Sequence, residues 1–491
     1  MRRRVVVLAL AVLCAGLAAT LATTARQRTG VDPEVDARPD GCGRDYLAQA
    51  QQTIPTWVYV GDRNAPASGP VPPQRRLEGV LVSRFERDLV VHPTPEDLPT
   101  IHRSYDLNLN VLPDPAYRGL LGGSAAGRTG NFAGHGESTA RVHVEREQGS
   151  LPFFAWPEAG DRVAMVGSWV WDCGHWAGGG ERTEIHPFRA IWVDRGGEGD
   201  LFLSSDKTFA GVEADCAHAA KSVVAAFRAC LATEPSWQDL SGSYRFRLRL
   251  PTRPAGARLR LRVVDAGSTT GAPRARAHVR GGGVDVTLQV HAKPGQKLVI
   301  AQRVLAGWTG QAPTDHVRVR LTRLLVRRAM DPGCPGGRTS CGSKETTHGE
   351  QATAPPGEWN VYVDAAGVWK MWGNGLLRAR DGQVFHGGPT FDLRLPRGRP
   401  WRVFVFTREC DFGSLGNADG ATHAMNPCPR SSEFGTFDGD DVPGISVAHF
   451  RSPSAALGLH RLRPRRLGST CPAVNRLGCY ELELRVDRVQ G

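Results

Sequence analysis

Apolar and polar residues alternate in short segments along most of this chain, and glycines and prolines separate the segments. A two-residue period predicts β-strands that bury one face. In the first part of the chain, the predicted strands cover residues 81–91, 105–112, 140–145, 162–171 and 184–193. Such a set predicts a small closed barrel, OB-like or of a related kind. The stretch 214–232 has helical spacing instead, and it predicts one helix after the barrel.

The same alternation predicts further β-domains in the rest of the chain. Strands over 244–250, 259–264, 284–290, 298–304 and 317–326 are typical of a β-sandwich, and strands over 358–363, 390–395 and 401–406 predict a second one. We therefore expect an all-β protein, with a small OB-like or related barrel, one helix, and one or two sandwiches. The predicted boundaries are a barrel domain at 41–200, a helical connection at 201–240, a sandwich at 241–330, a linker at 331–356 and a C-terminal sandwich at 357–491.

The N-terminal segment has the order of a secretory signal. Three arginines follow Met1, an apolar run comes next, and small residues lead into polar sequence. This order predicts a signal peptide over 1–25 and a linker over 26–40. The apolar run is nearly long enough to span a bilayer, so an uncleaved signal anchor is the alternative. We expect a secreted or extracytoplasmic protein that contacts a membrane only if this segment stays uncleaved.

Ten of the 11 cysteines lie after the predicted signal peptide. An even number of cysteines in an exported chain predicts disulfides. Three predicted bridges close short loops, and they join Cys334 with Cys341, Cys410 with Cys428, and Cys471 with Cys479. Cys216 and Cys230 flank the core of the predicted helix, and a continuous helix would hold them about 21 Å apart. Either that helix is broken, or each of these two pairs with Cys42 or Cys173.

The formal net charge is +12, and six of the 61 basic residues are lysine. The arginines alternate with apolar residues, as in 245–249 and 258–262, which favours solvated strand faces over a basic patch. Nucleic acid is therefore not an expected partner. Binding of an anionic cell-envelope polymer through the arginines is an alternative, and such binding would weaken steeply with salt.

Candidate chemistry is concentrated in one segment, because the G-x-S-x-G elbow, the P-loop, H-E-x-x-H and the dinucleotide fingerprint are all absent from the sequence. Residues two apart on a strand share a face, so Glu184 and His186 should project together. A glycine-rich turn would bring Asp172 and His175 back toward them. Two imidazoles and two carboxylates suit zinc, manganese or iron, with a metal-bound water as the nucleophile.

A structural interpretation of the same segment stays open. Asp172 and His175 would brace the turn, while Glu184 and His186 would satisfy each other's hydrogen bonds. Buried polar groups commonly form such closed networks. The network would lie beside three tryptophans, which are Trp169, Trp171 and Trp176.

A second polar stripe precedes this segment. Asp106, Asn108 and Asn110 alternate with apolar residues, so one strand face carries a carboxylate and two amides. Such a face is usually solvated. If the strand lay beside residues 184–186, His102, Asp106 and Asn108 would extend the same site toward the ligand number of a two-metal phosphoesterase.

Acidic residues also gather in the C-terminal part, at 409–411, 417–419 and 438–441. Loop carboxylates at one end of a sandwich can bind calcium. Ordinary turn chemistry of Asp and Asn explains the same residues. Calcium is therefore a weaker cofactor expectation than a divalent transition metal.

Three motifs resemble those of a group of exported bacterial proteins of uncharacterised activity. They are D-L-P-x-x-H-x-S-Y-D-x-N at 97–108, W-D-C-G-H at 171–175 and T-E-I-H-P at 183–187. The resemblance is strongest over residues 95–195. It implies a shared architecture and supplies no mechanism.

Two functions remain open from the sequence. The first is a non-catalytic binding or structural protein of the cell envelope or exterior, with a cell-surface ligand or polymer as partner. The second is a metal-dependent, phosphoesterase-like hydrolase that uses Asp172, His175, Glu184 and His186. Convergence of these side chains in an open cleft would favour the hydrolase, and their burial would favour the binding protein.

Overall fold

The structure is a computed structural model of the whole chain. It describes residues 57–60, 74–82, 106–147, 152–177, 180–207, 211–212, 216, 224–235, 237–253, 255–293, 295–309, 313–329, 357–373, 377–409, 444–464 and 479–490. The predicted signal peptide and both predicted linkers lie outside these residues. Within them, no helix combines the length and the apolar character needed to cross a membrane.

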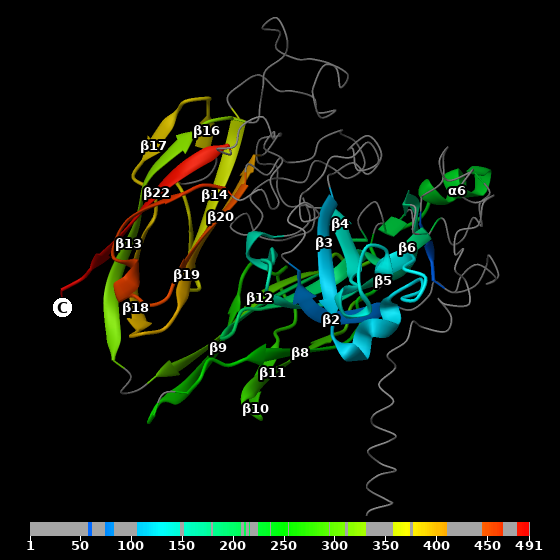
Figure 1. Cartoon of the computed structure of the whole chain (residues 1–491), viewed down its shortest axis with the longest axis horizontal. Coiled ribbons are helices and arrows are strands. Elements are labelled where there is room, and N and C mark those ends of the chain that lie inside the picture. Colours follow the sequence, from blue (N-terminus) through cyan, green and yellow to red (C-terminus); the bar gives the residue numbers. More distant parts are fainter. Residues whose placement is uncertain are drawn as a thin grey trace, which may run out of the picture.

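Five strands close into a small barrel in the first part of the described chain (Figure 1). They are β2 (Arg75–Leu81), β3 (Asp106–Pro113), β4 (Val142–Glu147), β5 (Arg162–Ala177) and β6 (Gly180–Asp194). Their order is β5-β2-β3-β4-β6, and β5 pairs with β6 to close the ring. Only the pairing of β4 with β6 is parallel among these strands. All five contribute to one apolar core, through residues such as Leu77, Val111, Val144, Met165 and Ile185.

The barrel sheet continues beyond β6 and becomes one layer of a sandwich. β7 (Glu198–Ser204), β12 (Val299–Thr309) and β9 (Arg258–Asp265) extend it, and β1 (Trp57–Tyr59) pairs with β5. The second layer holds β8 (Gly242–Arg249), β11 (Gly283–Val290) and β10 (Arg276–Arg280). The layers share a core in which the ring of Trp192 stacks on that of Phe246 at 5.3 Å. Alternate residues of β8 are buried and exposed, and its arginines are exposed, which confirms the prediction of solvated strand faces.

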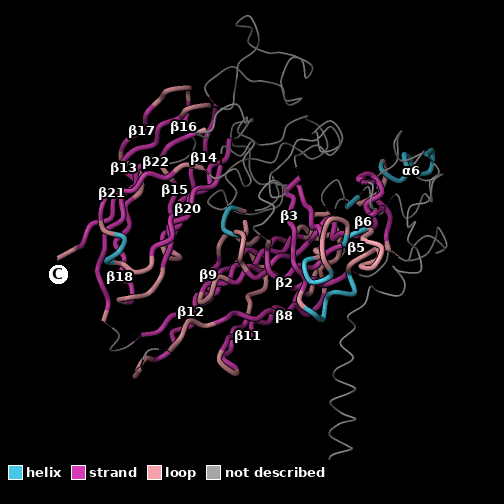
Figure 2. Tube along the Cα trace, viewed as in Figure 1, coloured by secondary structure: helices cyan, strands magenta, loops and turns pink. Residues whose placement is uncertain are grey.

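The C-terminal part is a sandwich of two five-stranded sheets (Figure 2). One sheet contains β13 (Thr314–Val326), β17 (Val384–His386), β18 (Thr390–Pro396), β21 (Gly458–Leu462) and β22 (Tyr480–Arg488). The other contains β14 (Gly357–Ala365), β15 (Val368–Met371), β16 (Leu377–Ala379), β19 (Trp401–Glu409) and β20 (Gly444–Phe450). The fully buried rings of Trp359 and Tyr480 meet edge to face in its core. The prediction of an all-β chain with a barrel and sandwiches is confirmed.

Strand β13 differs from its predicted place. The sequence pattern groups residues 317–326 with the strands of the first sandwich. In the structure, β13 pairs with β17, β18 and β22 of the C-terminal sandwich instead. Alternation predicts a strand and its buried face, but it does not specify which distant strand supplies the hydrogen bonds.

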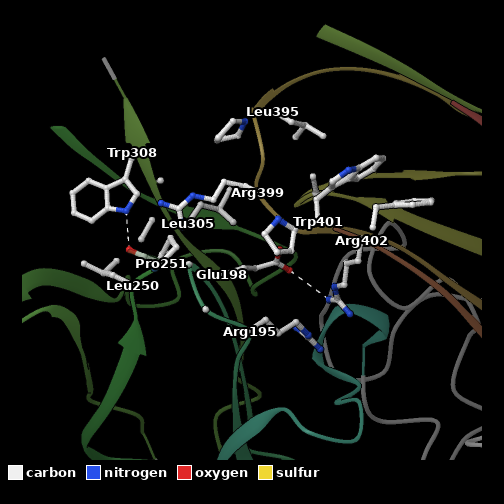
Figure 3. Close-up of a pocket in the computed structure, with 18 of the residues that line it drawn as sticks. Arg195, Glu198, Leu250, Pro251, Leu305, Trp308, Leu395, Arg399, Trp401 and Arg402 are labelled. Atoms are coloured by element: carbon white, nitrogen blue, oxygen red, sulfur yellow. Dashed lines mark hydrogen bonds and ion pairs between the residues drawn. The ribbon is translucent and has the colours of Figure 1, made fainter. Parts of the chain in front are cut away.

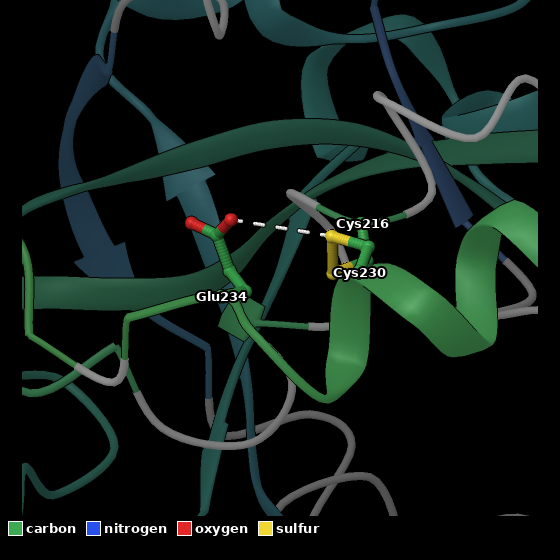
Figure 4. Close-up of side chains that lie close together, drawn as sticks. All are labelled: Cys216, Cys230 and Glu234. Atoms are coloured by element: carbon green, nitrogen blue, oxygen red, sulfur yellow. Dashed lines mark hydrogen bonds between the residues drawn. A yellow bond between two sulfur atoms is a disulfide. The ribbon is translucent and has the colours of Figure 1, made fainter.

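The described α-helix is α6 (Val224–Leu231), and the short 3₁₀ turns are Pro115–Leu120, Gly130–Phe132, Glu137–Thr139, Phe153–Ala155 and Ser454–Ala456. Cys216 and Cys230 form a disulfide beside α6, with their Cα atoms 5.4 Å apart (Figure 4). That separation excludes a continuous helix between them, so the broken helix is the alternative that holds. Cys479 is also disulfide-bonded. Cys42, Cys334, Cys341, Cys410, Cys428, Cys471 and the Cys173 side chain lie outside the described residues.

Candidate functional site

A buried group of polar side chains lines one face of the barrel wall. It comprises Asn110 on β3, His143 and Glu145 on β4, and Glu184 and His186 on β6, each at most 5% exposed. Strands β4 and β6 run parallel, with His143 opposite Glu184. A His-x-Glu sequence therefore lies beside a Glu-x-His sequence. The intervening Val144 and Ile185 point the other way, into the barrel core.

Short contacts join these side chains. His143 Nε2 lies 2.5 Å from Glu145 Oε1, and His143 Nδ1 lies 3.2 Å from Asn110 Oδ1. His186 Nδ1 lies 3.2 Å from Glu184 Oε1 and 3.4 Å from Glu145 Oε2. One donor atom each from His143, Glu145 and Glu184 lie within 4.8 Å of one another. These three residues could hold a metal ion between two neighbouring strands.

The electrostatics of the cluster are dominated by burial. Burial raises the pKa of Glu184, the carboxylates of Asp172 and Glu145 raise it further, and His186 lowers it. Asp172 on β5 is buried and accepts a hydrogen bond from Arg182 Nε at 3.0 Å. Although burial opposes the charge of Arg182, the three carboxylates raise the pKa of its guanidinium. Asp172 is thus engaged by an arginine.

The structure describes only some of the site residues that the sequence predicts. Glu184 and His186 share a strand face and are in contact. The side chains that the structure does not describe are those of His102, Asp106, Asn108 and His175. The backbone of Asn108 pairs with Glu145, so β3 does border the cluster strands, but through β4.

The tryptophans correct one detail of the structural interpretation. Trp169 and Trp171 do not lie beside the carboxylates. They belong to the apolar core on the opposite face, because Trp169 is paired with Ile185 and the neighbouring Val170 with Glu184. Sequence reasoning also missed His143 and Glu145. The signal that could have found them is the alternation H-V-E at 143–145, which mirrors E-I-H at 184–186.

A second candidate site is a pocket between the central sheet and the C-terminal sandwich (Figure 3). Its volume is about 780 Å³. It is lined by the segment before β5, the turn before β7, the residues that follow β8, the end of β12, the β18–β19 turn, and the end of β20. The apolar part of the lining includes Leu250, Leu305, Trp308, Trp401 and Phe450.

Charged residues of the pocket wall are largely paired with one another. Arg402 contacts Glu158 and lies 3.9 Å from Glu198, which also contacts the buried Arg303. Burial raises the pKa of Glu198, and Arg303 opposes that rise. Burial also lowers the pKa of Arg402 to about 10. These ion pairs form a fixed, internally compensated wall.

Arg399 lines the mouth of the pocket, and Arg253 lies outside the lining, beside the Trp308 ring. The Arg399 side chain extends toward Trp308, and its guanidinium donates to the carbonyl of Thr252 (Figure 3). Trp308 Nε1 donates to the Pro251 carbonyl at 2.9 Å, which fixes the indole. The Arg253 guanidinium carbon lies 5.8 Å from the centre of the Trp308 ring. Neither arginine forms an ion pair with a carboxylate of any described residue.

Comparisons with known proteins identify no family. No family model matches this chain, and no curated protein matches it. Among solved structures, a C2 domain of plant extended synaptotagmin 1 aligns with 36% of this chain and 98% of its own, at 12% identity and a TM-score of 0.20. A likeness at that TM-score carries no argument about fold or function.

Proposed function

We propose that this protein is an exported, non-catalytic binding protein, and that the pocket between its central sheet and its C-terminal sandwich binds an acidic saccharide. The observation that carries the proposal is the pocket mouth, where Arg399 extends toward Trp308 and has no carboxylate partner among the described residues. A short segment of an anionic surface polymer has the matching chemistry.

Each part of the mouth matches a part of such a ligand. The flat C–H face of a sugar ring packs on an indole, whose polar edge is already satisfied by Pro251. A guanidinium binds a carboxylate through two parallel hydrogen bonds, with more geometric specificity than an ammonium group. The volume of about 780 Å³ lies in the range of about 300–1,000 Å³ that is typical of small-molecule sites.

The hydrolase alternative has less support at both candidate sites. A catalytic metal keeps an open coordination position for substrate, whereas the cluster on the barrel wall is buried. In the pocket, Glu158, Glu198 and Asp161 all face arginines. A glycoside hydrolase needs one carboxyl group as an acid and another as a nucleophile or base, and these three groups are engaged by arginines instead.

The test is a titration of the full-length, oxidised protein with an oligogalacturonate and with a neutral oligosaccharide of equal length, followed by calorimetry and tryptophan fluorescence. We expect the acidic ligand alone to bind. Arg399→Gln should weaken binding about 10- to 100-fold, because it removes a charge-assisted hydrogen-bond pair. Trp308→Ala should reduce the fluorescence change, because Trp401 also lines the pocket.

Arg394→Gln is the matched control, because Arg394 is an exposed arginine of β18 outside the pocket lining. It should bind as the unmutated protein does. Equal affinity in Arg399→Gln and the unmutated protein would contradict the pocket assignment. Equal losses in Arg394→Gln and Arg399→Gln would indicate diffuse polyanion binding by strand faces instead.

A further inference from the structure

The geometry points to a divalent transition-metal site in the barrel wall, held by His143 Nε2 and by one carboxylate oxygen each of Glu145 and Glu184. This site is separate from the proposed saccharide pocket. Of the four metal ligands that the sequence predicts, it includes only Glu184. Its chemistry is that of zinc, manganese or ferrous iron, because imidazole and carboxylate together suit these ions better than calcium or magnesium.

The pairing of strands β4 and β6 brings the three proposed metal ligands together, and all three lie on strands. His143 lies directly opposite Glu184 on the parallel strands β4 and β6, and Glu145 follows two residues later on the same face. Their donor atoms already lie within 4.8 Å of one another. Ligand atoms around a tetrahedral zinc ion are about 3.3 Å apart, so small side-chain rotations complete the site while the strands stay in place.

The surroundings of His143 are those of a metal ligand. The side-chain oxygen of Asn110, 3.2 Å from His143 Nδ1, can only accept a hydrogen bond, so it holds a proton on Nδ1 when a metal replaces the proton that Nε2 shares with Glu145 Oε1. Nε2 is then the nitrogen that faces the carboxylates. A histidine that donates its far N–H to an outer partner while its near nitrogen faces acidic oxygens is the usual arrangement around a protein-bound metal.

An independent observation is the free oxygen of Glu184. Glu184 is 2% exposed, and its Oε2 has no hydrogen-bond donor within the part of the chain that the structure describes. A buried carboxylate oxygen without a donor is costly, and a bound cation removes that cost.

The grouping of carboxylates supports the same conclusion. The buried carboxylates of Glu145 and Glu184 belong to one group of donor atoms within 4.8 Å, and Asp172 is buried on the neighbouring strand β5, so their negative charges repel one another. A divalent ion between Glu145 and Glu184 offsets this repulsion. Because Asp172 is held by Arg182, the proposed ligand set leaves it out.

The test is the metal content of the untagged, oxidised, full-length protein after dialysis against zinc, manganese or ferrous iron and then buffer. We expect about one equivalent of one of these ions per chain. Glu184→Gln keeps the shape of the side chain and should lose the metal. Asn110→Ala, which removes only the outer partner, should weaken metal affinity about 10- to 100-fold without changing the stoichiometry at saturation.

His278→Ala is the control for adventitious binding, because His278 is exposed on β10, away from the cluster. It should bind as much metal as the unmutated protein. Retention of the metal by a folded Glu184→Gln variant would overturn the assignment. If Glu184→Gln fails to fold, chelation of the unmutated protein decides. A midpoint of thermal unfolding that falls on chelation and recovers with zinc supports the site, and no bound metal with an unchanged midpoint overturns it.

Discussion

Arg303 links the central sheet to the C-terminal sandwich, and its removal should destabilise the protein strongly. Its guanidinium is 2% exposed and lies 2.7 Å from Asp200 and 2.6 Å from Asp364. It also contacts Glu198. Asp200 and Glu198 belong to β7, whereas Asp364 belongs to β14 of the C-terminal sandwich. The positive charge of Arg303 therefore neutralises buried carboxylates of both the central sheet and the C-terminal sandwich.

The expected magnitude follows from what Arg303→Met leaves behind. Asp200 keeps its contact with Arg195, but Asp364 loses the only cation that it contacts in the described chain. Breaking a buried ion pair by removing one partner typically costs about 3–5 kcal/mol. Burial already raises the pKa of Asp364, and Arg303 lowers it. Without Arg303 that pKa rises further, so the loss should be smaller at pH 5 than at pH 8, because protonation removes the buried charge.

The assay is urea denaturation followed by tryptophan fluorescence and by circular dichroism, since the two transitions must coincide before a free energy of unfolding is defined. Arg318→Met is the control, because Arg318 pairs with Asp392 at the surface and should contribute less than about 1 kcal/mol. Combining Arg303→Met with Asp364→Asn should recover part of the loss. A loss below about 1 kcal/mol in Arg303→Met, or strict additivity with Asp364→Asn, would refute the role assigned to this contact.

Three further predictions concern other parts of the chain. Burial raises the pKa of Asp161 from 3.8 to about 6 although Arg195 opposes it, so the folded state holds more protons between these values, and the free energy of unfolding should fall by about 2 kcal/mol from pH 4 to pH 6. Titration of stability against pH should show this slope in the unmutated protein but not in Asp161→Asn. Replacing Cys216 and Cys230 by serine opens a loop with a separation of 14 residues and should cost about 3 kcal/mol in non-reducing urea denaturation. Trp359→Ala removes a fully buried indole that donates to Ala329 and should cost about 3–5 kcal/mol, and a loss under about 1 kcal/mol would contradict its place in the core.

Strands were predictable from the sequence because a strand that buries one face alternates apolar and polar residues. The alternation over 244–250 corresponds to β8, and that over 184–193 lies within β6. Which strands pair was not predictable, because hydrogen bonding between distant strands leaves no local pattern. β13 shows this limit, since its own alternation is regular while its partners lie in the C-terminal sandwich.

The same limit explains how much of the polar cluster could be predicted. Glu184 and His186 are two residues apart, so a strand assignment alone places them on one face. His143 precedes Glu184 by 41 residues, and the two meet only through the parallel pairing of β4 with β6. The arginines show a related failure, because their scatter correctly predicted solvated faces on β8 but gave no sign that Arg303 would be buried in an ion-pair network.

Strand β6 connects the two candidate sites. Glu184 and His186 lie near its beginning, whereas Arg195, in the pocket wall, directly follows its end at Asp194. At about 3.3 Å per residue, the ten residues from Glu184 to Asp194 separate the sites by about 30 Å. Direct electrostatic influence between them is therefore screened at physiological ionic strength. Any effect of metal removal on saccharide binding must pass through the packing of β6 and β7, so binding that survives chelation would identify the metal as a local brace of the barrel wall.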